Sequence, residues 1–97
     1  MSKNTGRSTE RLYMAICGLS TPEECRTFFD DICTIKEVHD MAQRLEIAEM
    51  LDGGESYQAI CEKTGASTTT IGRVNRCLKY GDGGYRSALD RLAGKED

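Results

Sequence analysis

Apolar side chains recur along this chain at intervals of three and four residues, the spacing that places them on one face of a helix. Two early stretches show the spacing at positions i, i+3, i+4 and i+7, namely Leu12, Ala15, Ile16 and Leu19, then Cys25, Phe28, Phe29 and Ile32. Trp is absent, Pro occurs once, and β-branched residues are sparse. This composition argues against a β-sandwich or barrel. We therefore predict an all-α fold.

Capping residues and glycines divide the pattern into about six helices. The runs Thr21-Pro22-Glu23-Glu24 and Thr34-Ile35-Lys36-Glu37 have the Thr-x-x-Glu spacing of a capping box. Gly53-Gly54 stops the third helix near Asp52. We expect helices over about residues 8–18, 21–32, 34–52, 56–63, 67–79 and 85–93.

The length of 97 residues predicts one helical domain over residues 1–97, with loose tails at 1–7 and 94–97. No apolar run approaches the roughly 18–20 residues that span a bilayer, so we expect no membrane partner. The first residues lead into no stretch that resembles a signal peptide, which favours a cytoplasmic protein.

The third predicted helix is apolar on more than one side. One stripe comprises Ile35, Val38, Ala42, Leu45 and Ala48, and the apolar surface is widened by Met41, Ile47, Met50 and Leu51. Such a helix needs cover from more than one direction, which a chain with few other elements does not supply. A second subunit would provide it, so we predict a homodimer.

The net charge of −3 conceals a basic segment. Residues 23–55 carry ten acidic side chains against three basic ones, whereas residues 56–80 carry four basic ones against one acidic. Contact with a polyanion is therefore expected on residues 56–80 and disfavoured elsewhere.

That basic segment also has the spacing of a helix-turn-helix, which we place at residues 56–80. Ile60, Ile71 and Val74 are the apolar positions that lock two helices together, and the small Cys61 falls where the helices cross. Gly65 occupies the turn position that requires a left-handed backbone. Several features agree here, so this signal is more specific than a lone glycine motif.

The second helix of this segment has suitable chemistry for the major groove of duplex DNA. Its first turn presents short hydroxyl groups, Gly72 allows a close backbone approach, and Arg73 and Arg76 lie on one face, where either could bind guanine or phosphate. Lysines favour phosphate contacts. The candidate DNA-binding residues are Gln58, Lys63, Ser67, Thr68, Thr69, Thr70, Gly72, Arg73, Arg76 and Lys79.

The run from Ala66 to Gly81 resembles the Trp repressor family, and within it the YerC/YecD-type branch. The resemblance implies an all-helical fold of about six helices, an intertwined homodimer, and a DNA reader made of the fourth and fifth helices. It also implies a weak candidate ligand site, in which Arg44 and Arg73 flank an indole and Thr34 lies near its amino group.

The chain departs from the family at that ligand site. Val74 replaces the glycine that leaves room for the indole ring, and Cys77 replaces a serine. We therefore do not expect tryptophan as corepressor, and an effector, if one acts, has an unknown identity. For Arg44 we favour a salt bridge to Asp40 or Glu37 on its own helix.

Other chemistry is not indicated by the sequence. Five cysteines lack metal-ligand spacing and are interpreted as small buried thiols, and no catalytic set, cofactor or metal site is found. Tyr80 and Tyr85 are expected to pack at the last helix. The predicted function is a sequence-specific DNA-binding transcriptional regulator, a repressor reading a roughly palindromic operator. Two alternatives remain open: a helix-turn-helix protein-interaction module, and an effector or redox sensor.

Overall fold

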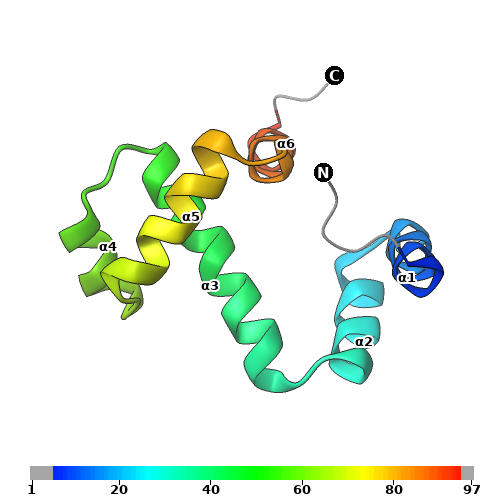
Figure 1. The fold of residues 1–97 in the computed structure, drawn as a ribbon. Coiled ribbons are helices and arrows are strands. Elements are labelled where there is room, and N and C mark those ends of the chain that lie inside the picture. The colour runs from blue at the N-terminus through cyan, green and yellow to red at the C-terminus, as the bar shows by residue number, and fades with distance from the viewer. Residues whose placement is uncertain (1–5, 95–97) are drawn as a thin grey trace. The chain divides into compact units, whose positions relative to one another are not determined.

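The computed structural model describes residues 6–94. This part of the chain contains six helices and no strand, which confirms the predicted all-α fold (Figure 1). The helices are α1 (Arg7–Cys17), α2 (Pro22–Ile32), α3 (Ile35–Asp52), α4 (Tyr57–Thr64), α5 (Thr68–Tyr80) and α6 (Gly84–Leu92). Residues 1–5 and 95–97 of the expected tails lie outside the described residues. Arg7, expected in the tail, is instead the first residue of α1.

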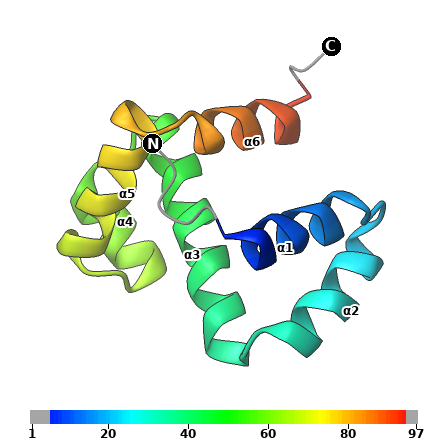
Figure 2. The same cartoon turned by 45° about the vertical axis from the view of Figure 1, so that its right-hand side comes forward.

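By compactness the chain divides into two units, Met1–Val38 and His39–Asp97, and α3 runs across their boundary. The first unit contains α1, α2 and the beginning of α3 (Figure 2). No side chain of α1 or α2 is fully buried. Both helices nevertheless have the apolar stripe that the sequence predicts, so their apolar faces are left partly open to solvent.

The predicted capping boxes form in this first unit. The Thr21 hydroxyl accepts a hydrogen bond from the Glu24 amide at 3.1 Å, and the Glu24 carboxylate accepts one from the Ser20 amide at 2.7 Å. The Thr34 hydroxyl likewise accepts from the Glu37 amide at 3.1 Å, and the Glu37 carboxylate accepts from the Thr34 amide at 2.8 Å. These bonds satisfy amides that helix starts would otherwise leave unpaired.

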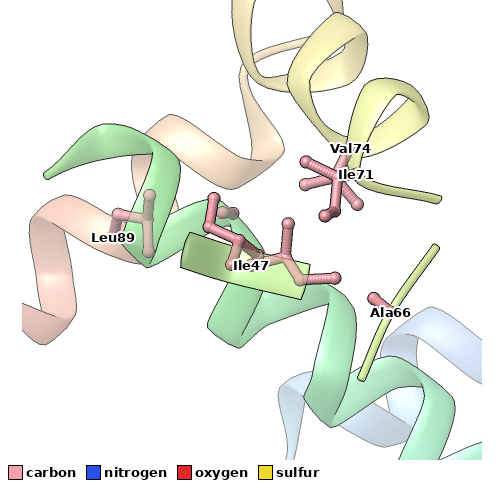
Figure 3. Close-up of a cluster of buried hydrophobic side chains, with 7 residues drawn as sticks. Ile47, Ala66, Ile71, Val74 and Leu89 are labelled. Atoms are coloured by element: carbon pink, nitrogen blue, oxygen red, sulfur yellow. The ribbon is translucent and has the colours of Figure 1, made fainter. Parts of the chain in front are cut away.

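The second unit contains the buried core (Figure 3). It is built from apolar side chains of α3 to α6 and of the turn between α4 and α5, namely Ile47, Ala48, Ile60, Ala66, Ile71, Val74 and Leu89. Three of these, Ile60, Ile71 and Val74, are the residues that the helix-turn-helix spacing predicts as the locking positions. The half-buried Cys61 packs against the same cluster. This core fixes α4 and α5 on α3.

A hydrogen-bonded ion pair joins α6 to the end of α3. The Arg86 guanidinium donates two hydrogen bonds to the Asp52 carboxylate, at 2.8 and 3.0 Å, and a third to Asp90 at 3.2 Å. This bonding raises the pKa of Arg86 above its usual value. The paired geometry fixes the direction of α6 more firmly than a single ion pair would.

None of the six described helices is both long enough and apolar enough to cross a membrane.

The interpretation of the cysteines as buried thiols is wrong. Cys17 and Cys77 are exposed, and Cys25, Cys33 and Cys61 are only half-buried. A cysteine on an apolar stripe is buried only where another element covers that stripe.

Candidate nucleic-acid interface

The segment from Ser56 to Tyr80 forms two helices joined by a tight turn, as predicted. Ser56 and Ser67 cap α4 and α5, each accepting a hydrogen bond at 3.1 Å from the amide three residues later. Gly65 ends α4 with φ +78°, a left-handed backbone that glycine adopts without steric cost. The α4 and α5 helices pack against one another. The caps and the glycine therefore fix where each helix begins and ends.

Thr64 stabilises this turn from within. Its hydroxyl donates to the Ile60 carbonyl at 2.7 Å and accepts from the Ala66 amide at 3.1 Å. The Gln43 side chain on α3 donates to the Thr64 carbonyl at 3.1 Å. Sequence reasoning missed Gln43, because the two residues lie 21 positions apart and no local pattern connects them.

One side of α5 is open and hollowed. Five of its residues fall at helical spacing along this side, and we refer to them as the α5 face: Thr69, Gly72, Arg73, Arg76 and Tyr80. They line a hollow of about 750 Å³ together with Tyr57 of α4 and with Thr68, Asn75 and Cys77. A Cβ added at position 72 would meet no atom within 4 Å, so the backbone at Gly72 is open to the hollow.

The charge of the α5 face is uncompensated. Arg73 and Arg76 are both exposed, and among residues 6–94 neither forms an ion pair with a carboxylate. No acidic residue occurs in α5 or among the residues that line the hollow. Two guanidinium groups without partners make this surface suited to phosphate or to the acceptor edge of guanine.

The structure brings Thr68, Thr69, Gly72, Arg73 and Arg76 together in the hollow and leaves the other five candidates outside it. Gln58 and Lys79 are exposed on α4 and in the last turn of α5.

Ser67 and Thr70 form the cap of α5. The Ser67 hydroxyl caps α5 and also donates to the Thr70 hydroxyl at 3.2 Å.

Lys63 lies on a different surface from the arginines. Its ammonium group is 2.8 Å from the Glu55 carboxylate. It lines a second hollow, between α3 and the end of α4, that also contains Glu46 and Glu49. The Glu55 carboxylate, at 2.8 Å, compensates the charge of Lys63 and disfavours a phosphate at this position. The net charge of the sequence segment did not reveal these acidic surroundings, because Lys63 lies within the basic segment.

Of the three weak ligand candidates, Arg73 lines the hollow beside α5. Thr34 forms the capping box of α3. Arg44 forms no ion pair among the described residues, so the salt bridge expected for it is absent. Burial raises the pKa of the Tyr85 hydroxyl, and the nearby positive charge of Arg44 opposes that rise. Val74 is 2% exposed and belongs to the core.

The two tyrosines near the end of α5 differ from one another. Tyr85 packs against the core, as expected. Tyr80 is 83% exposed and lines the hollow, so the expectation that it packs at the last helix is wrong. In residues 6–94 no cluster of three or more histidine, cysteine or acidic side chains could hold a metal ion.

Comparison with known proteins shows where this architecture occurs. The family model described as Trp repressor protein matches residues 7–93, which is nearly the whole chain. The chain belongs to the Trp repressor family. This membership suggests a DNA-binding regulator, and the family is regulatory rather than enzymatic. The predicted resemblance is confirmed.

Individual relatives agree with this assignment. The chain is 50% identical over 92 residues to the uncharacterized protein YerC of Bacillus subtilis, a match that covers 95% of this chain and 88% of YerC. Among solved structures, a TrpR-like protein from Eubacterium eligens has 45% identity and a TM-score of 0.88, with 96% of both chains covered. A putative Trp repressor from Staphylococcus aureus has 43% identity and a TM-score of 0.87, with 92% of this chain and 89% of that one covered.

Proposed function

We propose that this member of the Trp repressor family is a sequence-specific DNA-binding transcriptional regulator that acts as a cytoplasmic homodimer. The observation that carries the proposal is the α5 face, where Arg73 and Arg76 stand without carboxylate partners beside the open surface at Gly72. A helix with uncompensated guanidinium groups and no acidic residue matches the negative potential of the major groove. Repression follows most simply, because a protein bound at an operator occupies that site.

In the proposed complex, α5 enters the major groove with its first turn toward the base edges. Thr68 and Thr69 offer hydroxyl and methyl groups, of which the methyls suit thymine. Arg73 and Arg76 bind guanine or clamp phosphates through two parallel N–H groups. Gln58 and Lys79 lie at the margins, where contacts with the DNA backbone position the protein without specifying sequence.

The homodimer is supported by apolar surface that the single chain leaves open. In the first unit, Ile35 is 92% exposed, Met14 67% and Ile32 53%. Large apolar side chains at this exposure on several consecutive helices are typical of an interface rather than of a solvated surface. A second copy of the chain presents the same surface, so a two-fold interface would cover both.

The same two-fold arrangement would present two α5 helices to successive major grooves, about 34 Å apart. Tryptophan is not proposed as corepressor. Val74 replaces the glycine that gives the indole room in the family pattern, and the Val74 side chain is 2% exposed in the core.

The proposal is tested by a salt titration with duplex DNA of random sequence. Phosphate contacts release counterions, so the logarithm of the association constant should fall steeply and linearly with the logarithm of salt concentration. Arg73→Ala and Arg76→Ala should each weaken binding about ten-fold or more, whereas Arg26→Ala, an exposed arginine on α2, should not. Binding without a salt slope, or unchanged binding in both α5 variants, would instead favour a protein-interaction module.

A further inference from the structure

Two tyrosines line the hollow beside α5 and lie outside the buried core. Tyr80, the last residue of α5, is 83% exposed, and Tyr57, the first residue of α4, is 38% exposed. Neither belongs to the buried core or to the apolar side chains packed against it. Both line the same hollow as Arg73 and Arg76. A large ring held open on a charged surface is typical of a contact surface, where its apolar body and polar tip are both used.

The position of the two tyrosines relative to the α5 face indicates what they contact. Tyr80 follows Thr69 by eleven residues, which corresponds to about 16 Å along the helix axis. The major groove is about 12 Å wide, so a helix whose first turn meets base edges extends beyond the groove at its other end. That end lies near the sugar–phosphate backbone.

Tyr57, the first residue of α4, lines the same hollow as Tyr80. In a helix-turn-helix bound to DNA, the first helix crosses the backbone while the second enters the groove. The first turn of α4 borders the hollow through Tyr57, which lies outside the buried core. The Tyr57 hydroxyl at the start of α4 is therefore placed for a backbone contact, as is the Tyr80 hydroxyl at the end of α5.

We propose that Tyr57 and Tyr80 are positioning residues that donate hydrogen bonds from their hydroxyl groups to phosphates of duplex DNA at the two margins of the α5 face. This inference rests on the proposed DNA-binding function. A phenol hydroxyl is a neutral donor, so each contact orients the protein on the duplex without releasing a counterion of its own. The tyrosines thus hold α5 in register, while Arg73 and Arg76 supply charge.

The test compares tyrosine and phenylalanine on the duplex that the wild-type protein recovers from a random-sequence pool. Tyr57→Phe and Tyr80→Phe should each weaken binding about ten-fold, the loss expected when a hydrogen bond to a charged group is removed. The slope of binding against salt should be unchanged, whereas Arg76→Ala should reduce it by about one for each phosphate that this variant no longer binds. Tyr13→Phe is the matched control, because Tyr13 is 51% exposed on α1.

The Tyr80→Ala variant distinguishes the hydroxyl from the ring. If the hydroxyl is the contact, Tyr80→Ala should bind about as weakly as Tyr80→Phe, with the melting temperature unchanged. Wild-type affinity in both phenylalanine variants would overturn the inference. So would a loss found in Tyr80→Ala but not in Tyr80→Phe, because it would assign the contact to ring stacking. A wild-type protein that recovers no duplex at all would refute the proposed function instead, so the two failures are separable.

Discussion

The Gln43 side chain on α3 donates a hydrogen bond of 3.1 Å to the carbonyl of Thr64, the last residue of α4. This bond attaches the turn of the α4–α5 segment to the long helix behind it. Thr64 in turn bonds to Ile60 and to Ala66 through its hydroxyl. The orientation of α5 therefore depends on a polar contact at the turn as well as on the apolar core.

Removing the Gln43 donor should destabilise the fold. Gln43→Met keeps the length of the side chain but leaves the partly buried Thr64 carbonyl without this partner, and we expect a loss of about 1–2 kcal/mol in the free energy of unfolding. Gln58→Met is the control, since Gln58 is exposed and should change stability by less than about 0.5 kcal/mol. Urea denaturation measures both. Equal stabilities of the two variants would show that the bond contributes nothing.

Gly72→Ala should stabilise the protein and at the same time weaken its binding to DNA. Alanine is favoured over glycine within a helix by about 1 kcal/mol, and a Cβ at this position meets no atom within 4 Å, so the melting temperature should rise by several degrees. The added methyl group projects into the hollow and should weaken DNA binding.

Gly84→Ala is the matched control for this substitution. Position 84 is equally open and has no left-handed backbone, but it lies at the start of α6, away from the hollow. It should leave affinity for the duplex unchanged. A Gly72→Ala protein that melts higher and binds as tightly as the wild type would argue against close approach of the DNA at this point.

Ile35→Glu should shift the protein from dimer to monomer. Ile35 is 92% exposed in the single chain and is the first residue of α3, where a carboxylate is compatible with the helix. Burying a charge in an apolar interface is unfavourable, so the effect should act on association. Arg26→Glu introduces a carboxylate at an exposed position of α2 and serves as control. Sedimentation equilibrium would report an unaltered dimer for both if Ile35 lies outside the interface.

Tyr85 should make stability depend on pH in alkaline solution. Burial raises the pKa of its hydroxyl above 10.0, so the folded state favours the neutral phenol. The stabilisation of the protonated folded form is complete below the pKa of the unfolded chain and is lost as pH rises through the higher folded value. Wild-type stability should therefore decline relative to Tyr85→Phe between about pH 9 and pH 11. Thermal unfolding over this range should give curves that diverge, and parallel curves would be inconsistent with a raised pKa of the Tyr85 hydroxyl.

Local signals made the helices and the α4–α5 turn predictable. Thr34 and Glu37 form their capping box within four residues, and Gly65 adopts the left-handed backbone that its place after α4 requires. Such features depend on neighbours in sequence, so pattern and propensity identify them. The same holds for the locking residues Ile60 and Ile71, whose spacing follows from helix geometry.

Contacts beyond the local sequence determine the rest. Lys63 belongs to a basic stretch in sequence, and its partner Glu55 and the carboxylates on α3 give it an acidic setting that the sequence pattern does not show. Tyr80 flanks the glycine-rich end of α5, and this position in the sequence does not show that its ring stays 83% exposed. The helical spacing of apolar residues places Ile35 on an apolar face. It does not show whether that face packs against the same chain or against a second one.

In the proposed complex, two copies of α5, related by a two-fold axis, read successive major grooves of one duplex. Selection of bound sequences from a random duplex pool would reveal this arrangement. We expect an inverted repeat whose half-site centres are about 10–10.5 base pairs apart, and its loss from the pool selected by a protein carrying both Arg73→Ala and Arg76→Ala. Recovery of no enriched sequence, or of one site without two-fold symmetry, would contradict it.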